Sequence, residues 1–301
     1  MSLLVTGSIG IDTVSTPHGS AECVLGGSAV YFSFAATNFV PVRLVGVVGD
    51  DFPHEFREVL ESREIDLAGL ETRQGSKTFR WTGKFVGDMN EAETVDVSLN
   101  VLNEEGPEVP PEFSDSEVVF LANTQPSLQR ALLSQLSSPG LVVCDTMNLY
   151  IANERDSLIE TLALVTGVII NDDESRQLTE VTNLIEAGEA ILGLGPKFVI
   201  IKKGEHGALL VTADGPTAIP AYPSKLVCDP TGAGDSFAGG VMGYLARQGS
   251  WDTSTLRRAM VRGTVTASFA IEDFSLRRIS KTSRKEIDKR TSEYVDMLRI
   301  E

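Results

Sequence analysis

The sequence predicts an α/β fold with a mostly parallel central sheet, helices on both faces of that sheet and a small separate β segment. Three observations lead to this prediction. Short apolar runs rich in Val and Ile recur along the chain, stretches with helical spacing lie between most of them, and one segment alternates between apolar and polar residues. Strands covered on both faces read as continuous apolar runs, and parallel strands need connections that are usually helical.

The apolar runs are the predicted strands of the central sheet. They are continuous in their hydrophobicity, which indicates that both faces of each strand are covered. In chain order they are Leu3–Thr6, Val42–Val48, Val118–Leu121, Leu141–Cys144, Val168–Ile170 and Phe198–Ile201.

The predicted helices lie between these runs and at the end of the chain. Ala29–Asn38 is rich in small and aromatic residues, Phe52–Ser62 follows an acidic turn, and Leu184–Leu192 has apolar residues near both of its ends. The C-terminal region has the spacing of an amphipathic helix, with one face formed by Ile287, Thr291, Tyr294 and Leu298.

The segment Lys77–Val86 departs from this pattern because its residues alternate with a period of two. One face would carry Phe79, Trp81 and Phe85, and the other would carry Arg80, Thr82 and Lys84. A second extended piece, Thr94–Val101, follows, and the Pro-rich loop Glu104–Phe113 returns to the core. We expect a small antiparallel flap here, either a moving cover over a site or a fixed edge hairpin.

Charge and composition exclude several classes of protein. The chain has 301 residues and a formal net charge of −16, so it repels nucleic-acid backbones and anionic membranes, and neither is an expected partner. Three scattered His residues and three Cys residues without paired spacing argue against a zinc site. We expect these cysteines to be small buried residues in a reducing compartment. Without a signal sequence or a membrane-length apolar run, the expected location is the cytoplasm.

The most informative stretch is Asp229–Gly240, with the sequence DPTGAGDSFAGG. The run Thr231-Gly232-Ala233-Gly234 lacks bulk, so its backbone N–H groups can approach an anion closely. The residues after Gly234 have helical spacing, and a helix N-terminus favours phosphate. Asp235 would lie in the first turn, where it could accept the proton of an attacking hydroxyl. The alternative is a glycine-rich helix start in which Asp235 only complements the helix dipole.

These residues resemble the PfkB, or ribokinase-like, family of carbohydrate and nucleoside kinases. The DPTGAGDSFAGG segment is similar to the C-terminal signature of that family, and Gly26-Gly27-Ser28-Ala29 is similar to its N-terminal signature. Three further segments resemble family blocks in the order in which the family has them. They are Val45–Asp51, Asn171-Asp172-Asp173-Glu174 and Lys203-Gly204-Glu205-His206-Gly207.

The resemblance implies an ATP-dependent kinase that phosphorylates a hydroxyl of a small sugar, an inositol-like polyol or a nucleoside. It implies Asp235 as the catalytic base and Gly232, Ala233 and Gly234 as the anion hole. It also implies nucleotide binding by Asn171, Lys203, Gly204, Gly207 and Thr231, and water-mediated Mg²⁺ binding by Glu174. Read without the family, Asn171–Glu174 is an acidic helix cap.

On the acceptor side, the resemblance implies contacts from Asp12, Gly26, Gly27, Ser28 and Asn148. Asp229 and Thr231 match positions that help to hold a monovalent cation such as K⁺ in several members, and Ser275 is a weaker candidate for the same ion. The resemblance further implies one ribokinase-like domain over residues 1–301, with a lid at approximately 12–25 and 72–103. That lid often mediates a homodimer.

The chain also departs from the family pattern. Tyr31 stands where many sugar kinases have Asn, and Leu149-Tyr150 follows Asp145–Asn148 where several members have Arg. These differences argue against ribose or a phosphorylated sugar as the acceptor. Arg80 could bind a substrate phosphate, but a solvated strand face is the favoured interpretation of this residue.

Rival functions are harder to reconcile with the sequence. A dinucleotide-binding oxidoreductase needs G-x-G-x-x-G after its first strand, and a P-loop kinase needs G-x-x-x-x-G-K-[ST]. Neither pattern occurs in the chain. A non-catalytic sensor of nucleotides or sugars that keeps the fold remains the alternative.

Overall fold

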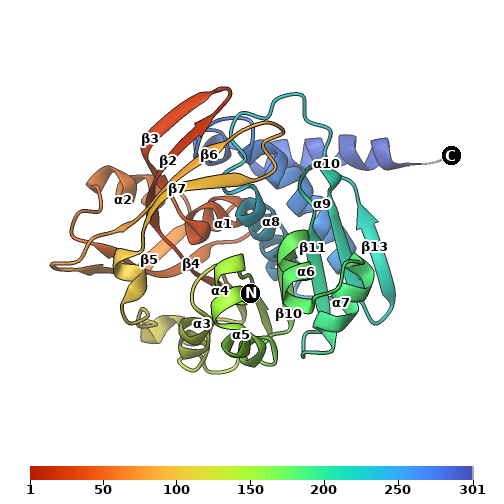
Figure 1. Ribbon diagram of the computed structural model, residues 1–301, viewed down its shortest axis with the longest axis horizontal. Helices are drawn as coiled ribbons and strands as arrows, with labels where there is room; N and C mark the ends of the chain where they lie inside the picture. Colours follow the sequence, from red (N-terminus) through yellow and green to blue (C-terminus); the bar gives the residue numbers. More distant parts are fainter. Residues whose placement is uncertain (300–301) are drawn as a thin grey trace.

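The computed structural model describes residues 1–299, and their strands form a large sheet and a small one (Figure 1). The large sheet has nine strands in the order β13-β12-β11-β10-β9-β8-β1-β4-β5. Its strands pair in parallel, except that β12 is antiparallel to both β11 and β13. They are β1 (Leu3–Thr6), β4 (Val42–Gly49), β5 (Ile65–Arg73), β8 (Val118–Leu121), β9 (Leu141–Cys144), β10 (Gly167–Asn171), β11 (Phe198–Lys202), β12 (Ala208–Thr212) and β13 (Gly215–Ile219).

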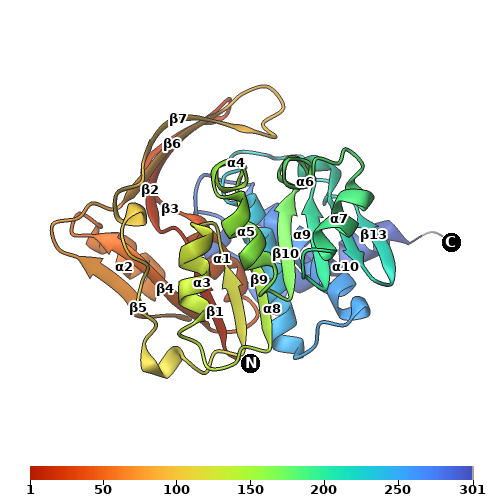
Figure 2. The same cartoon turned by 60° about the horizontal axis from the view of Figure 1, so that its bottom comes forward.

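Helices cover both faces of the large sheet (Figure 2). One face packs against α1 (Ser28–Ala36), α8 (Ala233–Gln248), α9 (Thr253–Ala270) and α10 (Arg284–Leu298). The other packs against α3 (Pro126–Leu133), α5 (Arg155–Leu162), α6 (Asp172–Thr179) and α7 (Leu184–Leu192). The short α4 (Asn148–Asn153) contacts α5 and α6, and α2 (His54–Glu61) packs beside β5.

Alternate residues of the central strands enter two separate cores. In β1, Leu3 and Val5 join the core under α1 and α8, whereas Leu4 joins the core under α3 and α5. This division explains the continuous apolar runs in the sequence, because each strand is buried on both faces. The predicted α/β class with a mostly parallel sheet is therefore confirmed.

The small sheet has four strands in the order β3-β2-β6-β7, and it arches over the large sheet in Figure 2. They are β2 (Gly10–Thr16), β3 (Gly19–Gly26), β6 (Phe79–Phe85) and β7 (Ala92–Ser98). The sequence predicted the antiparallel pair β6–β7 but not the parallel pairing of β2 with β6. The chain after β7 turns into a 3₁₀ helix, η1 (Asn100–Asn103), so the strand ends before Val101.

Polar contacts join the small sheet to the end of β4. The Thr78 hydroxyl accepts a hydrogen bond from Gly49 N at 3.0 Å, and Thr78 N donates to Asp51 at 2.7 Å. Arg80 pairs with the same carboxylate at 2.9 Å. Burial opposes ionisation of Asp51, but the hydrogen bonds from Thr78 and Arg80 outweigh it and lower the pKa of Asp51. Arg80 therefore serves the join between the sheets.

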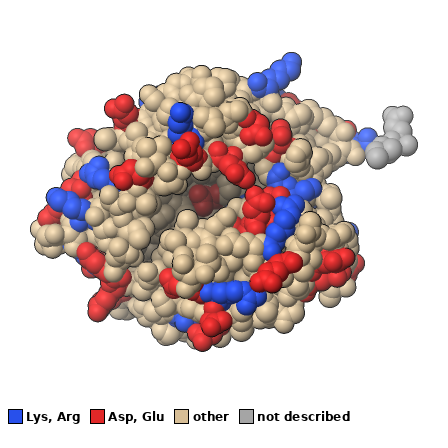
Figure 3. Space-filling model, viewed as in Figure 1, with Lys and Arg blue, Asp and Glu red and all other residues tan. Residues whose placement is uncertain are grey.

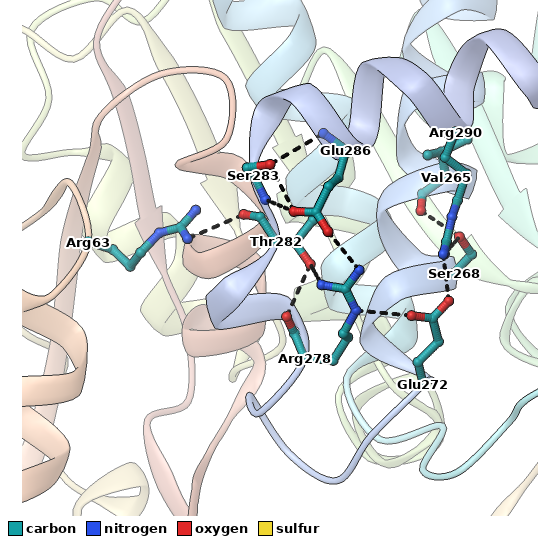
Figure 4. Close-up of polar contacts among 9 residues, drawn as sticks. All are labelled: Arg63, Val265, Ser268, Glu272, Arg278, Thr282, Ser283, Glu286 and Arg290. Carbon is teal, nitrogen blue, oxygen red and sulfur yellow. Dashed lines mark hydrogen bonds and ion pairs between the residues drawn. The ribbon is translucent and has the colours of Figure 1, made fainter.

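A network of ion pairs holds the C-terminal helix (Figure 4). Glu272 lies 3.1 Å from Arg278 and 2.7 Å from Arg290, and Arg278 also reaches Glu286 at 3.0 Å. Within α10, Ile287, Thr291 and Tyr294 are buried as the sequence predicted, while Leu298 is exposed.

Two further findings concern predictions made from composition. Cys144 is buried, but Cys23 is exposed in the turn-like distortion of β3 and Cys228 is partly exposed, so burial was predicted correctly for only one cysteine. Within residues 1–299, none of the helices combines the length and apolar character that a membrane-spanning segment requires.

Candidate active site

The glycine-rich segment forms a tight turn that leads into α8. Asp229 is buried at the start of this turn, and its two carboxylate oxygens accept hydrogen bonds from Thr231 N (2.9 Å) and Ser275 N (3.0 Å). Gly232 has φ +71°, and a Cβ there would lie 2.2 Å from Cγ of Tyr31. Only glycine fits this position, because both the backbone conformation and the space exclude a side chain. Asp235 follows in the first turn of α8.

Four charged side chains meet near the start of α8. Asp145 follows β9, Glu174 lies in α6, Lys202 ends β11, and Asp235 is in α8. Lys202 Nζ lies 3.3 Å from Asp145 Oδ2. The carboxyl ends of parallel strands share one edge of a sheet, which is why residues so distant in sequence converge there.

Burial and mutual repulsion shift the pKa values of these groups. Burial raises the pKa of Asp235 to about 6; Asp145 adds to this effect and Lys202 opposes it. Burial also raises the pKa of Glu174 to about 7, against the attraction of Lys202. Burial alone would lower the pKa of Lys202, but Asp145, Glu174 and Asp235 outweigh it and raise that pKa. A carboxylate whose pKa is close to neutral pH is suited to act as a general base.

Sequence reasoning missed Lys202 and selected its neighbour Lys203. The missing signal was the strand end: Lys202 closes the apolar run of β11 and pairs in register with Asn171 at the end of β10. Lys203, Gly204 and Gly207 instead form the turn around the 3₁₀ helix η3 (Gly204–His206), where Lys203 N donates to Gly207 O at 2.7 Å.

Asn171 and Glu174 form a capping box at the start of α6. The Glu174 carboxylate accepts from Asn171 N at 2.8 Å, and Asn171 Oδ1 accepts from Glu174 N at 2.7 Å. The interpretation of Asn171–Glu174 as a helix cap therefore agrees with the hydrogen bonds in the structure. Within the described part of the chain, no three His, Cys, Asp or Glu side chains converge as a metal site. Mg²⁺ often keeps several waters and binds mainly substrate phosphates. Glu174, a buried member of the charged cluster, therefore still fits a water-mediated role in binding this ion.

Asp12 and the Gly26-Gly27 pair, which were predicted to contact the acceptor, lie together in the structure. A Cβ on Gly26 would fall 1.8 Å from Asp12 Oδ2, so the glycine makes room for the carboxylate. Burial raises the pKa of Asp12 to about 7, the Gly27 N–H opposes the shift, and Asp229 and Asp235 add to it. Asp12 Oδ1 is buried without a hydrogen-bond partner. The structure therefore brings Asp12 into the electrostatic environment of Asp235.

Three other predicted residues are placed as follows. The Ser28 hydroxyl lies 3.0 Å from Ser8 Oγ in a buried pair, which engages the Ser28 side chain at the start of α1. Asn148 is exposed at the start of α4. Thr231 Oγ1 is buried without a hydrogen-bond partner in the glycine-rich turn before α8.

The space-filling view shows the site from outside. A hollow opens in the middle of this face, with acidic atoms on its rim and floor (Figure 3). The hairpin between β6 and β7 reaches the turn around η3, where Asn90 Nδ2 donates to Glu205 Oε1 at 3.2 Å. The small sheet and this turn therefore touch in the structure.

Comparisons with known proteins show the family to which the chain belongs. The model of the pfkB carbohydrate kinase family matches residues 3–282. The cytidine kinase of Thermococcus kodakarensis is 31% identical over 254 residues, which cover 82% of this chain and 89% of that protein.

Solved structures share the fold. The nucleoside kinase of Burkholderia thailandensis in complex with inosine superimposes with a TM-score of 0.80 at 18% identity, covering 97% of both chains. A candidate ribokinase II from Escherichia coli in complex with ATP and Mg²⁺ gives a TM-score of 0.74 at 18% identity, covering 97% of this chain and 99% of the other. The chain therefore belongs to the pfkB family of carbohydrate kinases and is an ATP-dependent phosphotransferase acting on a sugar or a nucleoside.

Proposed function

We propose that this kinase phosphorylates an uncharged acceptor held against Asp12, with Asp235 as the base that takes the proton of the attacking hydroxyl. The observation that carries the proposal is the position of Asp235. It lies in the first turn of α8, beside Lys202 and within electrostatic reach of Asp12, with its pKa raised to about 6.

The chemistry follows from that position. The acceptor oxygen attacks the γ-phosphorus of ATP as its proton passes to Asp235, and the bond from the γ-phosphorus to the β-bridging oxygen breaks to release ADP. The N–H groups of Gly232 and Gly234, at the positive end of α8, would stabilise negative charge on the transferring group. The N–H of Ala233, which was also predicted for the anion hole, instead donates to Pro230 O at 3.0 Å. Lys202 would hold the Asp145–Glu174–Asp235 cluster together electrostatically.

Nucleotide binding would use the turns around this cluster. We assign the phosphates to Thr231 and Asn171, and the rest of the nucleotide to the turn formed by Lys203, Gly204 and Gly207. Mg²⁺ bound with the nucleotide would neutralise phosphate charge, and Glu174 would hold it through water.

For Asp229 we propose a structural role in place of the predicted binding of a monovalent cation. Both of its carboxylate oxygens accept backbone N–H groups, from Thr231 and from Ser275. That arrangement fits a clamp on the anion-hole turn better than a ligand for a monovalent cation, so we derive no step from K⁺.

The charge of the site restricts the acceptor. Asp145, Glu174 and Asp235 share Lys202, Asp12 lies within electrostatic reach of Asp235, and Arg80 is paired with Asp51. A phosphorylated acceptor would meet net repulsion there. A neutral sugar, polyol or nucleoside would not.

We also propose that the small sheet acts as the lid over this site, as the resemblance implies. It joins β4 through Thr78 and Asp51 and reaches the nucleotide-side turn through Asn90. A homodimer formed through this sheet stays a prediction, and sedimentation of the purified protein tests it.

The direct test is ADP release with ATP, Mg²⁺ and a panel of nucleosides, sugars and polyols. Asp235→Asn should lower kcat by roughly 10²–10⁴ and still bind an ATP analogue in calorimetry, because it removes only the base. Asp156→Asn is the matched control, since Asp156 also lies in the first turn of a helix but far from the cluster. Unchanged turnover in Asp235→Asn would remove it from the mechanism. A wild type that binds ATP and transfers phosphate to nothing would favour the sensor.

A further inference from the structure

We propose that Trp81 is the platform on which a planar heterocyclic base of the acceptor stacks, so that the acceptor is a nucleoside. This inference rests on the proposed function, because it takes Asp12 as the residue that holds the hydroxyl-bearing part of the acceptor. It goes further in choosing among the neutral acceptors that the charge of the site allows.

The register of the small sheet places Trp81 beside Asp12. In the parallel pair β2–β6, Gly10 is opposite Phe79 and Asp12 is opposite Trp81. Residues opposite each other in register point to the same face of a sheet. A Cβ on Gly10 would lie 2.6 Å from the Phe79 ring, which agrees with this shared face.

That shared face is the one directed at the active site. Asp12 points toward Gly26, Asp229 and Asp235, as its contacts and pKa show. Trp81 therefore lies on the side of the small sheet that faces the acceptor.

The indole is also held in a defined position. Trp81 Nε1 donates to Thr94 Oγ1 at 3.1 Å. A Cβ on Gly83, two residues along the strand, would lie 2.0 Å from Cη2 of the indole and 2.2 Å from Cζ2, so the ring occupies the space that a side chain there would take. Trp81 is nevertheless only half-buried. An indole fixed along its edge and laid over the strand offers its outer face to a ligand.

The spacing suits a sugar bearing a base. Neighbouring strands are about 4.8 Å apart, so the side chains of Asp12 and Trp81 start one strand spacing apart on the same face. A ribose whose hydroxyls bind Asp12 can then present its attached base to the indole. Stacking between a base and an aromatic side chain is largely independent of sequence and needs only a planar partner. A hexose or an inositol has no such group.

The experiment uses the two tryptophans of the chain. Trp251 lines a separate surface depression with Lys197 and Asp214, away from the site, so Trp251→Phe leaves Trp81 as the single tryptophan. In that variant, cytidine and inosine should change the tryptophan fluorescence saturably, whereas ribose and myo-inositol should not. Absence of any change on binding of a nucleoside that is turned over would overturn the proposal.

Kinetics give the second readout. Trp81→Ala should lower kcat/KM for cytidine or inosine by about 5- to 150-fold, which corresponds to about 1–3 kcal/mol at 1.4 kcal/mol per factor of ten. Trp81→Phe should retain most of the activity because it keeps an aromatic face. For any base-free acceptor, Trp81→Ala should leave kcat/KM unchanged.

These outcomes separate the two levels of the proposal. If the wild type phosphorylates no acceptor of any class, the proposed function fails. If it phosphorylates nucleosides but Trp81→Ala lowers turnover of nucleosides and base-free sugars equally, only the stacking role fails. Turnover of base-free acceptors but not of nucleosides would also contradict the stacking role of Trp81.

Discussion

Two clusters of charged residues in this protein are built in opposite ways. In the network between α9 and α10, Glu272 lies between Arg278 and Arg290, and Arg278 also binds Glu286 (Figure 4). Each acidic group there has at least one cationic partner. At the start of α8, three carboxylates share Lys202, and Asp12 keeps a buried oxygen without a hydrogen bond.

The pKa values express this difference. Hydrogen bonds from Ser283 and Arg278 lower the pKa of Glu286 to about 2, so its charged form is favoured in the fold. Burial raises the pKa of Asp235 to about 6 and that of Glu174 to about 7, so their charged forms are disfavoured. The first cluster stabilises the protein, whereas the second holds carboxylates that are ready to accept protons at a cost in stability.

Of the substitutions that test this contrast, removal of the shared cation Lys202 should change the free energy of unfolding most. Lys202→Met leaves three buried carboxylates without the cation that they share, and we expect a loss of about 3–5 kcal/mol in the free energy of unfolding at pH 8. The loss should shrink at pH 5, because the carboxylates can then take up protons and become neutral. Urea denaturation at both pH values measures it. Equal losses at both would show that Lys202 acts only through packing, and Lys202→Arg, which keeps the charge, serves as the control.

A smaller effect of opposite sign is expected at Asp12. Its pKa is raised from 3.8 to about 7 in the fold, so its contribution to stability is complete below about pH 4 and is lost as the pH rises through 7. Asp12→Asn cannot ionise, and should therefore stabilise the protein by about 1–3 kcal/mol at pH 8 and by nearly nothing at pH 4. Thermal unfolding at the two pH values measures the difference. A variant less stable than the wild type at pH 8 would refute this sign.

The smallest predicted effect lies in the paired network. Glu272→Gln removes the charge that two Arg side chains share, and should cost about 1–2 kcal/mol while kcat stays unchanged. Lys289→Ala breaks an exposed pair with Glu293 and is the control, with an expected change below about 0.5 kcal/mol. Chemical denaturation of both variants, with ADP-release assays beside it, makes the comparison. A fall in kcat without a loss of stability would show that the network serves the site.

The sequence predicted the parts of the molecule that depend on local pattern. The apolar run at Phe198 was placed within one residue of β11, and the DPTGAGDSFAGG stretch was placed at a helix start because its glycines and Asp235 lie close together in the chain. The local structure of each of these segments could be predicted from its residue types alone.

Contacts between residues that are distant in the sequence could not be predicted in the same way. Lys202 and Asp145 are 57 positions apart, and their meeting depends on the order of strands in the sheet. The choice between Lys202 and Lys203 depends on where β11 ends. The pairing of β2 with β6, which puts Trp81 beside Asp12, likewise follows from topology and not from the alternation inside either strand.

The pH dependence of kcat/KM for the acceptor tests the central claim most directly, namely that Asp235 is a carboxylate poised to take a proton. With acceptor far below its KM, the wild type should lose activity below a midpoint near pH 6, because protonated Asp235 cannot act as a base. The residual rate of Asp235→Asn should lack this acid limb. A wild-type rate that stays flat down to pH 5, or an acid limb that persists in Asp235→Asn, would contradict the account.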